Sequence, residues 1–408
     1  MTVVAAALEI ELEGRKIGAL TALGGDRSVL TFTQAYTEDS DRPTLSLGFK
    51  TARGALVTDH PVVQTRVNPF FSNLLPEGGL RDYLARRAGV KAVREYALLQ
   101  VLGSDLPGAA TLVPVGEARQ QDDGPAPEDR TGAAGGPMRF SLAGVQLKFS
   151  ASLEGRDRLT VPASGAGGDW IVKLPSPRWD GVAENEFSMM TLASAVGLDV
   201  PEVRLVDLDG IEGLPVDVGG GTGKAFAVRR FDRSADGRRI HIEDFAQVFG
   251  VYPEEKYERA RYRSILRVLW HEIGETAARE FIGRLVFNTL IGNADMHLKN
   301  WSLIYPDGRT PALSPGYDFL TTTTYIADEN AALRYETTRR MAGFGADELV
   351  QMAARAGVPE TMALGAARRT VSRFHDVWAA EKANLPISNA VRDDVDRRLG
   401  TLPITALR

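Results

Sequence analysis

Residues 293–300, Asn-Ala-Asp-Met-His-Leu-Lys-Asn, contain the side chains of this chain that are best suited to chemistry. The segment gathers one carboxylate, one imidazole, one ammonium and two carboxamides within eight positions. A carboxylate can orient or deprotonate a hydroxyl group, and carboxylate and carboxamide oxygens are ligands for a hard cation such as Mg²⁺. An apolar run with helical spacing, residues 281–291, comes directly before the segment and is expected to position it.

The spacing within this segment points to phosphoryl transfer. Asp295 and Asn300 are five positions apart, as are Asp and Asn in the catalytic loop H-R-D-x-x-x-x-N of protein kinases. In that loop the aspartate orients the attacking hydroxyl and the asparagine binds Mg²⁺. Asp318 follows eighteen positions after Asn300, where a kinase would have its second metal ligand. We therefore expect Asp295 to be the base, and Asn300 and Asp318 to bind Mg²⁺.

Each of these side chains also has a purely structural interpretation. Asp295 could cap the end of the preceding helix, and Asp318, which follows Pro315-Gly316, could belong to a turn. Lys299 could neutralise the transferring phosphoryl group or be a solvated surface lysine. His297 could act in catalysis or only form hydrogen bonds that shape the loop. The polar neighbours of Asp295 favour its catalytic interpretation.

Lys173 is the candidate for binding the phosphates of a nucleotide. It lies in the short strand pattern Trp170-Ile-Val-Lys-Leu-Pro, where a charge is costly unless it is paired. Its counterpart is the strand lysine of kinases, which contacts nucleotide phosphates. Glu186, on the helix predicted next, is the expected ion-pair partner, with Glu184 as the second candidate. Alternatively, Lys173 lies on an edge strand and faces water.

Residues 141–148, Ser-Leu-Ala-Gly-Val-Gln-Leu-Lys, form the candidate phosphate-binding turn. The turn has one glycine, not the three of G-x-G-x-x-G, and it lacks the G-K-[ST] of a Walker loop. Backbone N–H groups of such a turn can bind phosphate. Taken alone, the pattern favours a plain β-hairpin.

Composition limits the class of protein. A length of 408 residues favours two to three domains, because domains typically have about 100–200 residues. The chain has no cysteine, which excludes disulfides, thiolate metal sites and cysteine nucleophiles. It shows neither an apolar run of about 20 residues nor the basic start of a signal peptide, so we expect a cytoplasmic protein with no membrane segment. The net charge of −5 argues against binding nucleic acid by bulk charge.

The order of the patterns predicts an α+β fold with two lobes, as in a kinase. Period-2 alternation predicts strands near 8–12, 17–23, 29–33 and 45–49. We expect a β-rich first domain (1–116), a linker rich in Gly, Ala, Pro and Asp (117–137), an ATP-binding part of the amino-terminal lobe (138–235) and an all-helical carboxyl-terminal lobe (236–408). The polar segment falls in the last of these.

Seven stretches, in this order along the chain, resemble the HipA family of toxin kinases. They are Asn73-Leu-Leu-Pro-Glu, the 141–148 turn, Ile171-Val-Lys-Leu-Pro, Asn185-Glu with Gly197-Leu-Asp-Val-Pro, Arg230-Phe-Asp-Arg, Ile291-Gly-Asn-Ala-Asp-Met-His-Leu-Lys-Asn and Tyr317-Asp318. The resemblance implies the HipA fold, which is similar to that of phosphatidylinositol kinases. It implies a serine/threonine protein kinase that uses ATP and Mg²⁺ and is the toxin of a type II toxin–antitoxin pair.

The resemblance also implies partners. The substrate would be a protein of translation, such as an aminoacyl-tRNA synthetase, and phosphorylating it would inhibit growth. A HipB-like helix-turn-helix antitoxin would neutralise the kinase, and DNA would be contacted only through the complex with the antitoxin.

By the same resemblance, individual residues receive roles. The ATP loop falls on Ala143, Gly144, Val145, Gln146, Leu147 and Lys148. The phosphate-binding lysine falls on Lys173, with Glu186 as its partner, and the adenine hinge falls on Arg229, Arg230 and Phe231. The general base falls on Asp295, the residues from His297 to Asn300 line the nucleotide site with Tyr317, and Asn300 and Asp318 hold Mg²⁺. At the hinge, this chain has arginine where one member of the family has an acidic residue.

Ser141 matches a serine that is autophosphorylated in the family. Its phosphate expels the phosphate loop and silences the enzyme. A phosphate adds about −1.5 to −2 charges, which would lie close to the phosphates of ATP. Without the resemblance, Ser141 would be interpreted as a turn hydroxyl.

Two other functions stay open. The first is a phosphotransferase for a small molecule such as an antibiotic, which shares the two-lobed plan and the spacing of Asp and Asn. The second is a catalytically idle, kinase-like corepressor that acts with an antitoxin. Arginines that could contact DNA in such a complex, or form a solvated helical surface, are Arg334, Arg339, Arg340, Arg368, Arg369 and Arg373. The intact Lys173, Asp295, Asn300 and Asp318 argue against lost catalysis.

Overall fold

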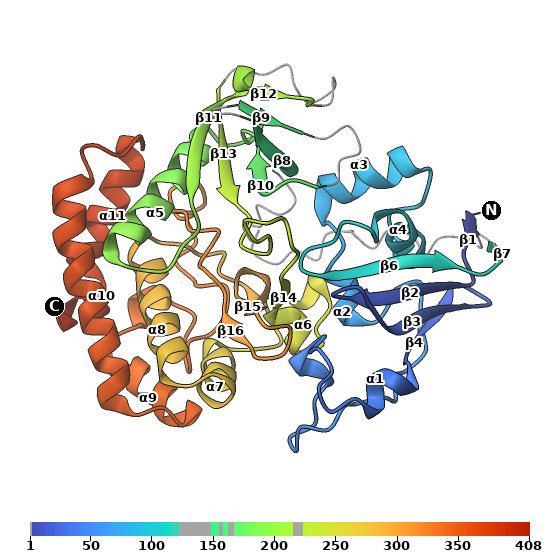
Figure 1. Cartoon of the computed structure of the whole chain (residues 1–408). Helices are drawn as coiled ribbons and strands as arrows, with labels where there is room; N and C mark the ends of the chain where they lie inside the picture. Colours follow the sequence, from blue (N-terminus) through green and yellow to red (C-terminus); the bar gives the residue numbers. More distant parts are fainter. Residues whose placement is uncertain (1, 118, 122–147, 155–157, 162–166, 215–222) are drawn as a thin grey trace. The chain divides into compact units, whose positions relative to one another are not determined.

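The computed structural model describes residues 2–117, 119–121, 148–154, 158–161, 167–214 and 223–408 (Figure 1). Ser141, the loop residues 143–147 and most of the predicted linker lie outside these ranges. Contacts group the chain into two compact units. Unit 1 contains Met1–Arg139, Asp232–Glu255 and Leu303–Thr310, and unit 2 contains Phe140–Phe231, Lys256–Ser302 and Pro311–Arg408. The segment boundaries that the sequence suggests stay predictions.

A five-stranded antiparallel sheet in the order β5-β4-β3-β2-β6 forms the centre of unit 1. Its strands are β2 (Ala7–Leu12), β3 (Arg15–Leu23), β4 (Arg27–Phe32), β5 (Val63–Gln64) and β6 (Ala110–Val115). Leu8, Ile10 and Leu12 are fully buried on one face of β2, as their alternation predicts. They share a core with Phe71 and Leu98 of the helices. The other elements are β1 (Thr2–Val4), β7 (Arg119–Gln121), α1 (Gln34–Glu38), α2 (Pro69–Ser72), α3 (Gly78–Ala88), α4 (Glu95–Leu102), β14 (His241–Asp244), α6 (Phe245–Val248) and, apart from its first residue, β15 (Ser302–Tyr305).

Residues 45–49 form no strand, so that prediction is wrong. Leu47–Phe49 form a 3-10 turn, although the alternating apolar residues are buried as a strand pattern would require. Ser46 Oγ accepts the Gly48 N–H at 3.0 Å and donates to Glu243 Oε2 at 2.5 Å, while Glu243 Oε1 accepts the Leu47 N–H at 2.9 Å. The bonds that Ser46 and Glu243 accept from backbone N–H groups take the place of the backbone hydrogen bonds that a strand would make in a sheet.

Replacing Glu243 by glutamine is expected to remove a pH dependence of stability. Burial raises the pKa of Glu243 to about 7 from 4.5, although hydrogen bonds from Ser46, Tyr305 and Leu47 act in the opposite direction. The folded chain therefore holds this proton more tightly than the unfolded chain, and the stabilisation is lost as the pH rises from 4.5 to about 7. Between pH 5 and pH 8, the free energy of unfolding should fall by about 2–3 kcal/mol more in the wild type than in Glu243→Gln. Urea unfolding measures this difference, and equal losses in the two proteins would contradict the prediction.

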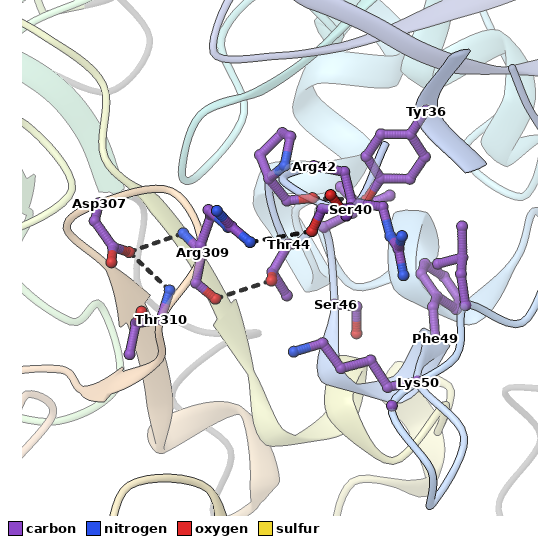
Figure 2. A pocket seen from close by; sticks show the side chains of 14 residues that line it. Tyr36, Ser40, Arg42, Thr44, Ser46, Phe49, Lys50, Asp307, Arg309 and Thr310 are labelled. Carbon is purple, nitrogen blue, oxygen red and sulfur yellow. Dashed lines mark hydrogen bonds between the residues drawn. The ribbon is translucent and has the colours of Figure 1, made fainter. Parts of the chain in front are cut away.

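Unit 1 also contains a pocket of about 370 Å³, between the loop before the 3-10 turn and residues 307–310 (Figure 2). Asp307 Oδ1 accepts the N–H groups of Arg309 at 2.8 Å and Thr310 at 2.7 Å, and Thr44 Oγ1 donates to the Arg309 carbonyl at 2.9 Å. The bond of Thr44 to Arg309 joins residues that are far apart in the sequence within one unit. None of the residues that the sequence predicts for chemistry lines this pocket.

A six-stranded sheet in the order β11-β13-β10-β8-β9-β12 forms the first part of unit 2. Its strands are β8 (Lys148–Glu154), β9 (Arg158–Thr160), β10 (Trp170–Lys173), β11 (Val203–Asp207), β12 (Ile211–Glu212) and β13 (Lys224–Arg229). Helix α5 (Val182–Val196) packs on β11 and β13 (Figure 1). It ends at Gly197, whose φ of 91° matches the predicted stop. Lys173 thus lies at the end of β10, between β8 and β13, and not on an edge strand.

Helices make up most of the remainder of unit 2. They are α7 (Tyr262–Glu272), α8 (Glu275–Leu290), α9 (Ala346–Ala356), α10 (Glu360–Glu381) and α11 (Asn389–Thr401). The expectation of an all-helical region 236–408 needs correction, because β14, β15 and β16 (Ala312–Leu313) also fall there. All four residues of β15 are buried, and periodicity cannot separate such a short apolar strand from a helix. No helix in the described part of the chain is long and apolar enough to span a membrane.

Candidate active site

Helix α8 supports the polar segment 293–300. Residues 281–290 of this helix are all buried, so close packing holds the helix in place. Gly292 follows with a φ of 71°, a left-handed conformation that favours glycine. A side chain at this position would also collide with Thr323 and Arg398. The segment therefore leaves the helix in a fixed direction.

Backbone hydrogen bonds hold Asp295 within the segment. Its N–H donates to Asn293 Oδ1 at 3.1 Å, and its carbonyl accepts the His297 N–H at 2.7 Å and Asn300 Nδ2 at 2.8 Å. Both Asp295 and Asn300 are buried. Because Asn300 uses its nitrogen in this bond, its Oδ1 is the atom that is suited to bind a cation.

Lys173 connects two carboxylates that are far apart in the sequence. Its Nζ lies 2.6 Å from Glu186 Oε1 and also forms an ion pair with Asp318 Oδ1. The Glu186 side chain is 1% exposed and that of Lys173 is 14% exposed, so this pair is largely shielded from water. The expected contact between Lys173 and Glu186 is present. The second contact, with Asp318, does not follow from the sequence pattern.

The charges of this cluster set its ionisation. Burial alone would raise the pKa of Asp318, but Lys173 and Lys148 lower it to about 2, so this carboxylate is ionised at neutral pH. Burial raises the pKa of Glu186 to about 7, although Lys173 acts in the opposite direction. Burial favours neutral Lys173, but Asp318 and Glu186 raise its pKa above the ordinary value. Asp318 is therefore in the ionised form in which a carboxylate can bind Mg²⁺.

Lys148 adds a second ammonium group next to Lys173. The two residues are directly opposite each other in the antiparallel pair of β8 and β10, and residues in this relation project from the same face of a sheet. The charge of Lys148 also reaches Asp318, whose pKa it lowers. Lys148 is exposed, so it can contact a bound anion. It is the one residue of the predicted ATP loop that the structure describes.

The backbone of Asp318 is held in an unusual conformation. Its φ is 58°, in the left-handed region that few residues other than glycine adopt. Asn293 Nδ2 donates to the Asp318 carbonyl at 3.0 Å and to Asn288 Oδ1 at 2.9 Å. Such conformations cluster at functional sites because the surrounding structure must impose them. Asn293 thus ties Asp318 to the segment that carries Asp295.

The predicted adenine hinge offers an aromatic surface. The rings of Phe231 and Tyr317 have centroids 5.7 Å apart, and the Tyr317 hydroxyl donates to the Lys299 carbonyl at 2.9 Å. The backbone N–H groups of Arg229 and Arg230 already donate to the carbonyls of Glu202 and Asp169, at 2.9 and 2.8 Å. These two N–H groups are therefore already occupied. The hinge role of residues 229–231 stays a prediction.

Tyr257 belongs to this cluster, although the sequence does not single it out. Its hydroxyl donates to Asp295 Oδ1 at 2.6 Å, and its ring meets the buried His297 ring edge to face at 5.0 Å. Tyr257 precedes Asp295 by 38 residues, and no spacing or composition marks it. Asn293 lies inside the predicted segment, but its hydrogen bonds to Asp318 and Asn288 are seen only in the structure. The catalytic roles of His297 and Lys299 stay predictions.

Asp318 and Asn300 offer oxygen donors of the type that Mg²⁺ prefers. Among the described residues, no three His, Asp or Glu side chains are grouped to hold a metal by themselves. Mg²⁺ at nucleotide sites typically takes only one or two protein ligands and completes its shell with phosphates and water. The ionised Asp318 and Asn300 Oδ1 are suited to be those ligands.

Two family models match this chain. The model described as "HipA-like C-terminal domain" matches residues 140–378, and the model described as "HipA N-terminal domain" matches residues 8–113. The first model alone covers more than half of the 408 residues. All residues that form the cluster around Lys173 and Asp295 fall within that match.

Individual relatives agree with the family models. "Putative kinase Y4dM" of Sinorhizobium fredii is 53% identical over 402 residues, which cover 97% of each chain. "Serine/threonine-protein kinase toxin HipA" of Shewanella oneidensis is 28% identical over 386 residues, covering 83% of each chain. A solved structure of the HipA, HipB and operator DNA complex from Shewanella oneidensis matches with a TM-score of 0.72 at 23% identity. It covers 98% of this chain and 96% of that chain, and it confirms the predicted α+β fold of the HipA type.

Proposed function

This chain belongs to the HipA family, and we propose that it is a serine/threonine protein kinase that transfers the γ-phosphate of ATP to a serine of another protein. The observation that carries the proposal is the cluster in which Lys173 bridges Glu186 and Asp318. Protein kinases need a lysine–glutamate pair and a metal-binding aspartate in place at the same time. Relatives that are named as kinases also support phosphoryl transfer as the class of reaction.

The proposed reaction uses each group in one role. Asp295 orients the serine hydroxyl and accepts its proton while the hydroxyl oxygen bonds to the γ-phosphorus. The bond from that phosphorus to the β–γ bridging oxygen breaks, and ADP leaves. Lys173 and Lys148 bind the phosphates of the nucleotide. Asn300 and Asp318 would hold Mg²⁺, which when bound neutralises phosphate charge.

One experiment distinguishes phosphate transfer to proteins from phosphate transfer to small molecules. The purified chain is incubated with Mg²⁺, γ-labelled ATP and cell extract, and the protein and small-molecule fractions are counted separately. The proposal predicts label in specific proteins, with the target expected among proteins of translation. Label confined to the small-molecule fraction would support the antibiotic type of phosphotransferase instead.

We also propose that this kinase is a toxin neutralised by a HipB-like antitoxin. Matches to HipA of Shewanella oneidensis support the proposal: the sequence match is named as a HipA toxin, and the structure match was solved as a complex of HipA with HipB and operator DNA. In this proposal, DNA is contacted through the antitoxin. Growth arrest on expression of the chain alone, relieved by co-expressing a helix-turn-helix partner, is the expected result.

Replacing Ser141 by alanine is expected to abolish self-labelling by ATP. A phosphate on Ser141 would add about −1.5 to −2 charges beside the loop that should receive the ATP phosphates, so it would lower activity. Mass spectrometry of the wild-type chain after incubation with ATP and Mg²⁺ should find one phosphate, on Ser141. Ser234, which is not in the proposed ATP loop, is the control, and Ser234→Ala should label like the wild type. A phosphate mapped to another residue would reject this role for Ser141.

A further inference from the structure

The hydroxyl of Tyr257 makes a hydrogen bond to the carboxylate of the proposed base, Asp295. It donates to Oδ1 at 2.6 Å. The three bonds described above fix the backbone of Asp295 at its N–H and its carbonyl. They leave the rotation of the carboxylate about its own side-chain bonds undetermined. The phenol supplies a constraint on that rotation.

Tyr257 is itself held on both sides. Arg339 Nη2 donates to its carbonyl at 2.5 Å, and the Lys256 ammonium lies 5.6 Å from the centre of its ring. The ring contacts His297 at an angle of 84°, and the Leu298 N–H donates to the Lys256 carbonyl at 3.3 Å. The tyrosine is thus connected to the catalytic segment through its ring and through the neighbouring backbone. A hydroxyl on so constrained a ring can define the position of its acceptor.

We propose that Tyr257 is a positioning residue that orients the Asp295 carboxylate toward the acceptor hydroxyl. This role rests on the proposed kinase function. A carboxylate has two oxygens with about four acceptor positions. A bond from Tyr257 to Oδ1 restrains the rotation of the group and helps to hold it toward the serine hydroxyl. Proton transfer requires hydrogen-bond distance and alignment, so a carboxylate free to rotate spends less time in the productive orientation.

The variant Tyr257→Phe tests the hydroxyl and keeps the ring that packs on His297. The rate of labelled phosphate transfer at saturating ATP should fall about 10–100-fold, while the ATP concentration for half-maximal rate stays unchanged and the melting temperature falls by only a few degrees. Tyr252→Phe is the matched control, because the half-buried Tyr252 donates to a backbone carbonyl, that of Val67, at 3.2 Å. It should transfer phosphate at the wild-type rate.

A double variant separates positioning from a structural effect. If Tyr257 acts only through Asp295, adding Tyr257→Phe to Asp295→Asn should cause no further loss of rate. A further 10-fold loss in the double variant, or a wild-type rate in Tyr257→Phe, would overturn the proposal. If the wild-type chain transfers no label at all while it is folded and binds ATP, the kinase function fails, and this role fails with it.

Discussion

The Asp295→Asn chain is expected to transfer phosphate about 1,000-fold more slowly than the wild type and still bind ATP. The carboxamide has nearly the same shape and can still accept the Tyr257 hydroxyl, but it cannot take a proton from the acceptor serine. General base catalysis contributes roughly 10²–10⁴-fold to rate, which sets the size of the effect. Initial rates of label transfer at saturating ATP, together with ATP titration by calorimetry, measure both parts of the prediction.

The control for this variant is Asp393→Asn, which makes the same chemical change on the exposed surface of α11. It should retain the wild-type rate. If Asp295→Asn kept a rate within about 10-fold of the wild type, Asp295 would not be the base. Loss of ATP binding in Asp295→Asn would indicate instead that the residue shapes the nucleotide site.

The second large effect is expected for Lys173→Met, which should lower both the transfer rate and the stability. Removing a cation that binds the reacting phosphates should lower the rate about 100-fold or more. Above pH 7, where Glu186 is ionised in the wild type, the same change leaves its buried charge without a cation, and breaking a buried ion pair costs about 3–5 kcal/mol. Because Asp318 also contacts Lys173 and is one-third exposed, we expect a value near the lower end, about 3 kcal/mol. Urea unfolding and label transfer measure the two effects.

A second substitution can separate these effects. Adding Glu186→Gln to Lys173→Met removes the buried charge, so most of the lost stability should return while the rate stays low. Lys382→Met is the control, because the Lys382–Asp396 pair is exposed and such pairs contribute about 0–1 kcal/mol. If the double variant were as unstable as Lys173→Met, the charge of Glu186 would not be the cause. If Lys173→Met transferred phosphate normally, Lys173 would not bind the phosphates.

The parts of the site that lie on regular elements follow from the sequence. The alternation around Lys173 predicts a buried strand charge, and the amphipathic pattern after residue 184 predicts a helix with a carboxylate to pair with it. Both elements and the Lys173–Glu186 contact are present. The helix before the polar segment and its glycine stop are present as well. These features depend on short-range periodicity, which a single sequence contains.

Contacts that join distant segments do not follow from the sequence in the same way. The ion pair of Lys173 with Asp318 joins positions 145 apart, and the bond of Tyr257 to Asp295 joins positions 38 apart. The 3-10 turn at 47–49 depends on Glu243, which is almost 200 positions away. Neither hydrophobic periodicity nor motif spacing encodes such pairs, because they are set by how whole elements pack.

The most direct test of the central claim is phosphoamino acid analysis after transfer from γ-labelled ATP, with the wild type and Asp295→Asn compared side by side. We expect phosphoserine in the protein fraction with the wild type and at least about 100 times less with Asp295→Asn. Equal labelling by the two chains, or label found only in small molecules, would contradict it.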